Sequence, residues 1–373
     1  MKNILELCLS PDLGGLELYM MRASHFLDAK TNVISVINES GKLQQYYKDT
    51  QYKYEMLARS SVFFSFVTAK KLAKIIDEHA IDIVHLHWTK DLPVAVLAKL
   101  FSKQKPKLVQ TRNMTMTRFK DDFYHRFLYK NMDLMLPVTY QVQEQLKKFI
   151  PESIRPKIEV LYMGAEEPEL IDDAQKQILR KEYKLDDSFT VGIVGRIEEE
   201  KGQYLVINAI KKLVEEGINA KALIVGHAMS EGYLNALKAD IKKNNIENNI
   251  LFTGFTREAQ KLMQLCDCLV LATDRETFGL VLVEAMACGI AVIGSDSGGP
   301  LEIIDDGKTG LLFKTKDYNS LACGIEKLIQ NSSLRERIAK AGQEKCEIMF
   351  SDKKQFEKLE KILNNLKLSI GNN

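Results

Sequence analysis

Two cations follow a short apolar run in the second half of the chain. Segment 192–202 places Gly195 at the end of an expected strand, and Arg196 and Lys201 follow in the same loop. Glycine lets the backbone approach a ligand closely, an arginine fork suits two diphosphate oxygens, and lysine adds a mobile charge. Phosphate binding is one interpretation of this spacing. The alternative is a solvated turn whose cations pair with the acidic residues 198–200.

A second stretch, 273–289, carries two carboxylates around the start of an expected helix near Gly279. Glu276 lies in the loop before the helix, and Glu284 lies one turn inside it. The helix dipole and the free amides of the first turn attract an anion. Carboxylates beside such a helix end suit a ligand with both a diphosphate and hydroxyl groups, such as a nucleotide sugar. The alternative is that Glu276 caps the helix and Glu284 pairs with a surface lysine. The free amides belong to Phe278, Gly279 and Leu280.

Four motifs in the second half resemble those of glycosyltransferase family 4. They are G-R-x-x-x-x-K-G at 195–202, E-x-F-G-L-x-x-x-E-A-M-A at 276–287, G-G-P-L-E at 298–302 and D-G-K-T-G at 306–310. The resemblance covers most of the chain. It implies the α/β GT-B fold, in which two Rossmann-like domains face each other across a cleft. It also implies transfer from a nucleoside-diphosphate sugar with retention at the anomeric carbon.

The resemblance assigns a role to each motif residue. Arg196 and Lys201 would neutralise the diphosphate leaving group, Glu276 would hold sugar hydroxyls near the reacting carbon, and Glu284 would hold the ribose hydroxyls. The sequence has no Asp-x-Asp. Because cations and amides can stabilise the leaving group, we expect no metal and no cofactor beside the co-substrate. The expected donor-binding residues are Gly14, Gly15, Gly195, Arg196, Lys201, Phe278, Gly279, Leu280, Glu284, Gly298 and Gly299, the last two forming a plain strand-to-helix turn in the alternative interpretation.

The first half carries two further candidate features. Gly14 and Gly15 resemble the family's G-G-x-E motif, whose glycines leave room where donor and acceptor meet; a helix start with Glu17 in its first turn explains them equally well. His85 and His87 end an expected strand, and alternation sends both to the same side. The family pattern places its active-site histidine at His87, a catalytic residue that would orient the reacting hydroxyl or sugar. The alternative is a structural core histidine.

The sequence indicates less about the acceptor substrate than about the donor. Residues 1–165 carry 24 Lys and Arg against 17 Asp and Glu, whereas residues 166–373 carry 28 against 33. Segment 112–130 interleaves cations with aromatics, and 62–66 precedes two lysines. Such faces suit an anionic membrane surface, unless the aromatics are core and the cations solvated. The basic balance favours a lipid-linked or anionic glycan acceptor, and no nucleic-acid-binding module is present. Within segment 112–130, the i, i+4 spacing of one helix face is shown by Phe119, Phe123 and Phe127.

Short apolar runs alternate with helical periodicity along the whole chain, as in α/β proteins. We expect an acceptor-binding domain at 1–165, a donor-binding domain at 166–354 after a linker at 165–188, and a terminal helix at about 355–373 that returns to the first domain. Expected strands cover 3–9, 32–37, 83–86, 107–111, 133–138, 158–161, 190–194, 220–225, 250–253, 268–272 and 291–295.

Composition places the chain among soluble globular proteins, with 45% hydrophobic and 27% charged residues. No segment approaches the ~20 apolar residues of a membrane span. Glu6 interrupts the first apolar run and no small-residue cleavage site follows, so the N-terminus indicates a strand rather than a signal peptide. We expect a cytoplasmic protein, peripheral on the inner face of the membrane, with free cysteines.

The sequence therefore favours a retaining glycosyltransferase that moves a hexose-type sugar to a growing cell-surface glycan or lipid-linked acceptor, as in lipopolysaccharide or polysaccharide biosynthesis. One alternative is a GT-B relative acting as a sugar-nucleotide epimerase, against which the spacing of Glu276 and Glu284 argues. Another is a non-catalytic nucleotide-sugar-binding protein that retains Arg196 and Lys201.

Overall fold

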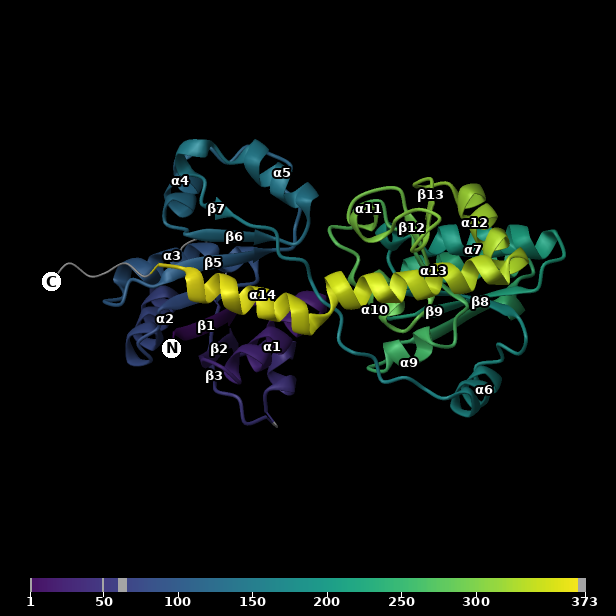
Figure 1. Ribbon diagram of the computed structural model, residues 1–373, viewed down its shortest axis with the longest axis horizontal. Coiled ribbons are helices and arrows are strands. Elements are labelled where there is room, and N and C mark those ends of the chain that lie inside the picture. The colour runs from purple at the N-terminus through teal and green to yellow at the C-terminus, as the bar shows by residue number, and fades with distance from the viewer. Residues whose placement is uncertain (1, 49, 60–65, 368–373) are drawn as a thin grey trace. The chain divides into compact units, whose positions relative to one another are not determined.

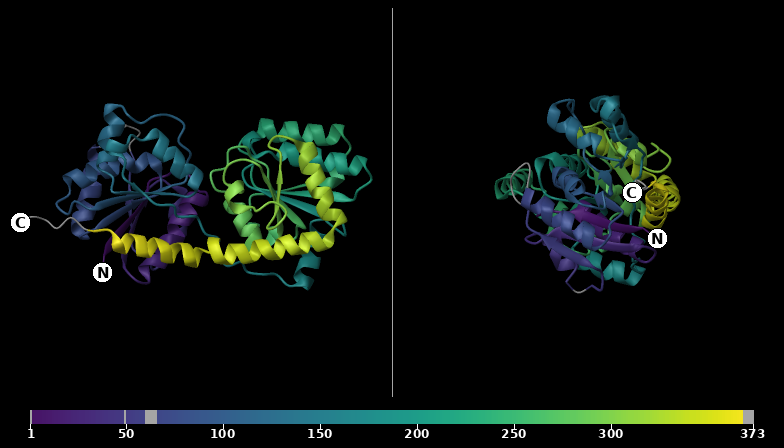
Figure 2. Two further views of the ribbon diagram at one scale, coloured as in Figure 1. Left: turned by 45° about the horizontal axis from the view of Figure 1, so that its top comes forward. Right: turned by 90° about the vertical axis from the view of Figure 1, so that its left-hand side faces the viewer.

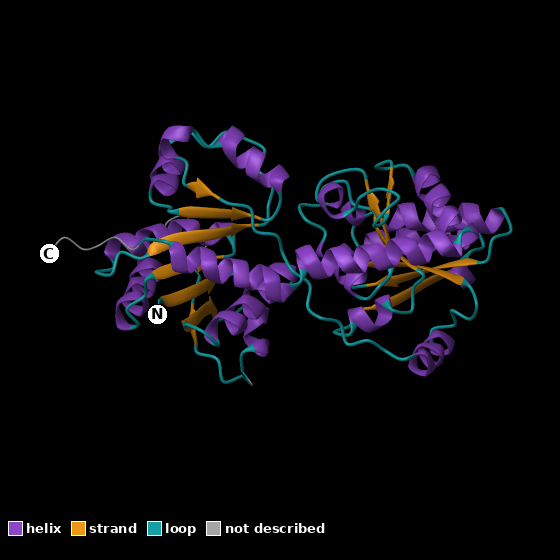
Figure 3. Ribbon diagram, viewed as in Figure 1, coloured by secondary structure: helices purple, strands orange, loops and turns teal. Residues whose placement is uncertain are grey.

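The computed structural model describes residues 2–48, 50–59 and 66–367, and the chain divides into two compact α/β units (Figures 1 and 3). The first unit comprises Met1–Met163 and Lys353–Asn373, and the second comprises Gly164–Asp352. In each unit, helices cover both faces of one sheet (Figure 2). No helix in the described ranges is long and apolar enough to cross a bilayer.

The first unit is built on a seven-stranded parallel sheet of order β3-β2-β1-β4-β5-β6-β7. Its inner strands are buried on both faces and consist mostly of apolar residues, which is why the sequence predicts them. The edge strand β3 is not among the expected strands because its residues are half-exposed and partly polar. The strands are β1 (Asn3–Cys8), β2 (Asn32–Asn38), β3 (Tyr54–Leu57), β4 (Ile83–Leu86), β5 (Lys107–Arg112), β6 (Leu134–Pro137) and β7 (Lys157–Ile158).

Helices α2 and α3 pack on one face of this sheet against Leu5, Leu7 and Val84, while α1 packs on the opposite face around Cys8. The opposite face of β1 also carries the buried Glu6. The helices of the first unit are α1 (Gly15–Asp28), α2 (Phe66–Glu78), α3 (Leu92–Phe101), α4 (Phe123–Lys130), α5 (Tyr140–Phe149) and α14 (Asp352–Asn365), with 3₁₀ turns η1 (Lys42–Tyr46), η2 (Thr89–Asp91) and η3 (Glu152–Ile154).

The terminal helix α14 packs within the first unit. The ring of Phe356 lies 5.4 Å from that of Tyr19 on α1, and Lys2 Nζ donates to the carbonyl of Leu363 at 2.9 Å. A helix 350 residues from the N-terminus thus completes the core around α1 and the first strand.

The second unit is built on a six-stranded parallel sheet of order β10-β9-β8-β11-β12-β13. Five of these strands match expected ranges within one residue at each end. The sixth, β13, has only three residues, too few for a periodic signal. The strands are β8 (Phe189–Val194), β9 (Ala220–Val225), β10 (Ile250–Gly254), β11 (Cys268–Leu271), β12 (Ala291–Ser295) and β13 (Leu311–Phe313).

The expected linker at 165–188 is not all loop, because it contains helix α6. This helix has no fully buried residue, so the apolar stripe that reveals other helices is weak; a capping box of Asp172 and Gln175 starts it. The helices of the second unit are α6 (Asp173–Glu182), α7 (Gln203–Glu215), α8 (Glu231–Lys243), α9 (Ala259–Met263), α10 (Leu280–Ala287), α11 (Pro300–Ile303), α12 (Tyr318–Gln330) and α13 (Ser332–Lys345), with 3₁₀ turns η4 (Glu199–Lys201) and η5 (Glu247–Asn249) and a π-helical turn, η6 (Cys346–Phe350).

Candidate active site

The loops that follow β8 and β9 are held together by two glycines. Gly195 N–H donates to the carbonyl of Val225 at 2.9 Å. Gly226 has φ +144°, and a Cβ on it would lie 1.8 Å from the carbonyl oxygen of Gly195. No other residue fits that contact, so the glycines fix the loop that carries the two predicted cations.

The predicted cations have different partners. Arg196 Nη2 lies 2.9 Å from Glu198 Oε1, with the Arg196 side chain 55% exposed, so it shows the local pairing that a solvated turn predicts. Lys201 Nζ instead lies 3.1 Å from Glu276 Oε2, and both side chains are partly buried. The Lys201–Glu276 pair joins the two main motifs of the second unit across 75 positions of sequence.

The loop that carries Glu276 packs against the loop after β12 through two more glycines. Gly299 N–H donates to the carbonyl of Glu276 at 2.9 Å. A Cβ on Gly298, whose φ is +68°, would lie 2.2 Å from that carbonyl oxygen, and one on Gly299 would lie 2.0 Å from the carbonyl oxygen of Phe278. These glycines therefore position residues 276–278. The sequence predicts that Gly298 and Gly299 line a sugar pocket or form a plain strand-to-helix turn, and both lie in the turn between β12 and α11.

Helix α10 begins directly after this loop. Gly279 is its N-cap, with φ +103° and no side chain to cap the first-turn N–H groups. Phe278 is buried and packs edge-on against Phe350 at 5.9 Å, which anchors the helix start. Leu280 is the first helical residue, and the half-buried Glu284 lies one turn further along. The arrangement is that of an anion-attracting helix end with carboxylates beside it.

These loops all lie at one edge of the second sheet. They follow the carboxyl ends of β8, β11 and β12, which are neighbours in the strand order, and open α/β sheets bind ligands at that edge. Gly202, with φ +74°, seats the cation loop there, because a Cβ on it would lie 2.6 Å from the carbonyl oxygen of Ala272.

Cavity size alone does not mark this edge. A cavity of about 360 Å³ adjoins it, lined by Gly202, Tyr204 and Arg275 among others. A larger one, of about 460 Å³, lies around Asp267 and Ala291, at the amino ends of β11 and β12. We assign the ligand edge from the strand ends and the charged groups, because they supply the chemistry.

In the first unit, Gly14 and Gly15 form the start of α1 and are exposed. Gly14 is the N-cap and Gly15 the first helical residue. Glu17, in the first turn, is buried, and its Oε2 would lie 3.5 Å from a Cβ on Gly14. Exposed glycines at a helix start leave room for a ligand, and their extended or helical backbone does not itself require glycine.

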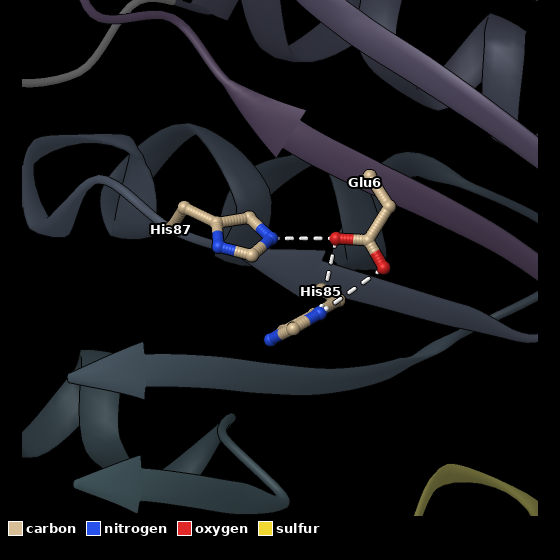
Figure 4. Close-up of side chains that lie close together, drawn as sticks. All are labelled: Glu6, His85 and His87. Atoms are coloured by element: carbon tan, nitrogen blue, oxygen red, sulfur yellow. Dashed lines mark hydrogen bonds and ion pairs between the residues drawn. The ribbon is translucent and has the colours of Figure 1, made fainter. Parts of the chain in front are cut away.

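His85 and His87 lie on the same side of the first sheet, as strand alternation predicts, and both contact Glu6 (Figure 4). Glu6 Oε2 lies 2.5 Å from His87 Nε2, and His85 Nδ1 lies 3.0 Å from the same oxygen. His85 Nε2 lies 2.8 Å from Thr111 Oγ1. All three side chains of this Glu6–His85–His87 cluster are buried.

The cluster shifts the pKa values of its members. Burial opposes ionisation of Glu6, but the two histidines outweigh it and lower the pKa of Glu6 to about 2. Burial and the neighbouring His85 lower the pKa of His87 to about 4, although the contact with Glu6 acts the other way. Near neutral pH, Glu6 is therefore a carboxylate and His87 a neutral imidazole.

Glu6 is the residue that the sequence interpretation missed. It appears there only as an argument against a signal peptide. The signal that could have revealed it is a charged residue at the centre of a strand that is otherwise apolar on both faces.

Among residues 2–48, 50–59 and 66–367, this cluster is the one group of three or more potential metal ligands whose ligand atoms are close enough to hold a single metal ion. Its geometry is that of hydrogen bonds. Two ligand atoms held tetrahedrally by one zinc ion would lie about 3.3 Å apart, whereas Glu6 Oε2 and His87 Nε2 are 2.5 Å apart.

The aromatic and basic segment 112–130 is less uniform than its sequence indicates. Phe119 precedes α4, so the predicted i, i+4 row of three phenylalanines on one helix is wrong; Phe127 packs on the core. Arg112 is buried and donates to Thr89 Oγ1 at 2.8 Å. Phe119 and Phe123 are 66% and 88% exposed. Of the second candidate segment, positions 62–65 lie outside the described residues.

Burial, together with the neighbouring Arg118 and Arg112, lowers the pKa of Lys120, although Asp122 acts the other way. Arg126, by contrast, is paired with Asp121. The exposed Phe119 and Phe123 therefore flank a short stretch in which Lys120 is followed by the carboxylates of Asp121 and Asp122.

Two protein-family models match the chain, one in each half. The model for glycosyl transferases group 1 matches residues 175–345, which include every donor motif, and the model for glycosyl transferase 4-like proteins matches residues 6–139. This chain belongs to glycosyltransferase family 4. The resemblance drawn from the motifs is confirmed, and the chain is a glycosyltransferase.

Glycosyltransferases from two bacteria are similar in sequence to this family 4 member over most of its length. The capsular polysaccharide biosynthesis glycosyltransferase CapM of Staphylococcus aureus is 26% identical over 349 residues, which cover 91% of each chain. The N-acetylgalactosamine-N,N'-diacetylbacillosaminyl-diphospho-undecaprenol 4-alpha-N-acetylgalactosaminyltransferase of Campylobacter jejuni is 28% identical over 279 residues, 72% of each chain.

Among solved structures, Anabaena HepE in complex with UDP and glucose superposes with a TM-score of 0.85 at 21% identity, covering 98% of this chain and all of HepE. The likeness confirms the expected GT-B fold of two parallel-sheet α/β domains.

Proposed function

We propose that this family 4 enzyme is a retaining, metal-independent transferase of a hexose-type sugar from a nucleoside diphosphate to a hydroxyl of a cell-surface glycan or lipid-linked acceptor. The observation that carries the proposal is the pairing of Lys201 with Glu276 beside the start of α10. It puts a cation, a carboxylate and the N-terminus of α10, which has no side-chain cap, at one edge of the sheet, as a nucleotide sugar requires.

The leaving group determines the work of the cations. Breaking the bond between the sugar and the diphosphate places negative charge on the bridging oxygen. Lys201, Arg196 and the first-turn amides of α10 stabilise that charge, which is the task that a metal performs elsewhere. In this proposal Glu276 holds the sugar hydroxyls, because its carboxylate accepts hydrogen bonds, and Glu284 holds those of the ribose.

Relatives support the substrate classes. HepE is described in complex with UDP and glucose, CapM is named for capsular polysaccharide biosynthesis, and the Campylobacter enzyme is named for a diphospho-undecaprenol acceptor. The exposed Phe119 and Phe123 beside Arg118 and Lys120 suit a peripheral contact with the anionic inner face of the cytoplasmic membrane, where lipid-linked acceptors are found.

Replacing Glu276 separates binding from chemistry. We expect Glu276→Ala to keep the affinity for the nucleoside diphosphate within a few fold, because the cations and amides remain, and to lower the transfer rate by about 10³-fold or more. Calorimetry with the nucleoside diphosphate and a radiolabelled-sugar transfer assay measure the two quantities.

The matched control is Glu258→Ala, which removes the carboxylate of a surface ion pair with Lys261 in the same unit. It should change neither quantity. Wild-type transfer by Glu276→Ala would remove Glu276 from the mechanism, and interconversion of nucleotide sugars without an acceptor would identify an epimerase.

The same assay tests the two other parts of the proposal. A chelator should leave the rate unchanged, and loss of activity that manganese restores would overturn metal independence. The anomeric configuration of the product, measured by proton NMR, should equal that of the donor, and an inverted product would contradict retention.

A further inference from the structure

The Glu6–His85–His87 cluster holds one polar atom without a hydrogen-bond partner in the part of the chain that the structure describes. That atom is Nδ1 of His87. A buried polar atom left unpaired is unfavourable, so native proteins rarely keep one without a use. His87 directly follows the carboxyl end of β4, the edge at which open α/β sheets bind ligands. The unpaired nitrogen therefore points to a ligand.

The contact with Glu6 determines which ring nitrogen of His87 carries the proton. Glu6 is ionised near neutral pH and has no hydrogen to donate, so at 2.5 Å the hydrogen between the two groups belongs to His87 Nε2. His87 is neutral in the same pH range and has only one ring proton. Its Nδ1 is therefore a hydrogen-bond acceptor.

We propose that Glu6 is a positioning residue that fixes His87 in the tautomer protonated on Nε2, so that Nδ1 accepts a hydrogen bond from a substrate hydroxyl. The inference rests on the proposed function, which supplies a hydroxyl-bearing sugar or acceptor. An acceptor nitrogen selects a hydroxyl over a phosphate oxygen, because an anion offers it no hydrogen.

The tautomer is measured directly by long-range ¹H–¹⁵N correlation NMR of the full-length protein labelled with ¹⁵N-histidine. The chain has 6 histidines, and the spectrum of His87→Asn assigns the signal of His87 by its loss. We expect a protonated Nε2 and an unprotonated Nδ1 near neutral pH. A protonated Nδ1 in the wild-type protein would overturn the inference.

A pair of matched variants tests the role of Glu6 in turnover. In Glu6→Gln, the neutral amide can either donate to or accept from His87, so the tautomer is no longer fixed, and we expect kcat or kcat/KM to fall about tenfold or more. The control is Glu55→Gln, because Glu55 Oε1 lies 3.1 Å from His79 Nε2 in an exposed pair of the same unit. It should behave as wild type.

The kinetic pattern identifies the hydroxyl. A raised KM for the nucleotide sugar places it on the donor, whereas a lower kcat at unchanged donor KM, or a raised acceptor KM, places it on the acceptor. Glu6→Gln with kcat and both KM values within twofold of wild type would contradict the proposal. If Glu6→Gln does not fold, the wild-type spectrum decides.

The two proposals fail differently. A protein that transfers sugar but has a protonated His87 Nδ1 defeats this inference alone. A protein that transfers no sugar from any nucleotide defeats the proposed function, while the NMR measurement still reports the tautomer.

Discussion

A fully buried acid, Asp91, lies four residues after His87 at the end of the 3₁₀ turn η2. Asp91 is fully buried in the first unit, and its Oδ2 accepts a hydrogen bond from the backbone N–H of Leu9 at 2.8 Å. Burial raises the pKa of Asp91 to about 7, against the opposing effects of that bond and of Arg59. In the folded protein Asp91 therefore keeps its proton over a pH range in which the unfolded chain loses it.

This difference makes stability depend on pH. The raised pKa means that the contribution of Asp91 is fully present below pH 3.8 and is lost as pH rises to about 7. Asp91→Asn keeps an oxygen for Leu9 and removes the titration. Relative to wild type, we expect its unfolding free energy to gain up to about 4 kcal/mol between these pH values. Urea unfolding at several pH values measures this.

Asp77→Asn provides a control of opposite sign. Asp77 accepts hydrogen bonds from Ser102 and from the N–H of Lys103, and these lower its pKa although burial opposes them. The contribution of Asp77 to the unfolding free energy is present above pH 3.8 and is lost at more acidic pH. The unfolding free energy of Asp77→Asn should therefore fall relative to that of wild type as pH rises. If the unfolding free energies of Asp91→Asn and wild type differ by the same amount at every pH, Asp91 is not buried in its protonated state.

At this scale the sequence predicts residues better than partners. Lys201 and Glu276 stand out by type and spacing, but their ion pair follows from the tertiary packing of loops that are 75 positions apart. Sequence alternation places His85 and His87 on one side, yet it cannot reveal Glu6, which reaches them from the neighbouring strand β1. Contacts between strands depend on register, which a single sequence does not display.

The elements of the second unit are positioned by glycines at loop crossings. Gly299 has a backbone conformation that any residue can adopt, so glycine is required there only for steric reasons. A Cβ would lie 2.0 Å from the carbonyl oxygen of Phe278. The loop that carries Glu276 and the start of α10 must move if that space is filled.

Gly299→Ala should therefore lower the unfolding free energy by about 2 kcal/mol or more and reduce transfer strongly, because backbone has to shift beside Glu276. Gly324→Ala is the matched control. Gly324 lies within α12, where the nearest atom to an added Cβ is 3.8 Å away, and alanine favours helix by about 1 kcal/mol. Calorimetric unfolding and the transfer assay compare them. Equal effects of both variants would show that the crossing does not constrain the loop.

Element prediction fails where burial is partial. The inner strands are mostly apolar, so the sequence predicts them, whereas the half-exposed β3 and the three-residue β13 give too little pattern. The sequence predicts a linker where helix α6 lies, because this helix has no fully buried residue. The predicted row of Phe119, Phe123 and Phe127 is wrong for another reason. The chain before α4 is not helical, so an i, i+4 spacing there does not place residues on one face.

At the scale of the whole molecule, the two halves differ in charge, and only the first half is basic. Its exposed Phe119 and Phe123 lie beside Arg118 and Lys120, a combination of apolar and cationic groups that suits an anionic bilayer surface. Electrostatic attraction of this kind is screened by salt.

We expect the protein to co-sediment with vesicles that contain phosphatidylglycerol at low salt, to be released at high salt, and to ignore phosphatidylcholine vesicles. Phe119→Ser/Phe123→Ser should abolish binding. Leu170→Ser/Ile178→Ser, at exposed positions of the second unit, should not. Absence of co-sedimentation at low salt, or equal binding by both double variants, would count against the surface.

The central claim concerns the donor site, and binding of nucleoside diphosphates tests it most directly. Saturation-transfer NMR with UDP, GDP, ADP, CDP and TDP should show binding of at least one. That binding should be lost when Arg196 and Lys201 are both replaced by Ala, because these cations meet the diphosphate, and it should persist in Glu276→Ala. If none binds at about millimolar concentration, or if the double variant binds as well as wild type, the donor assignment is contradicted.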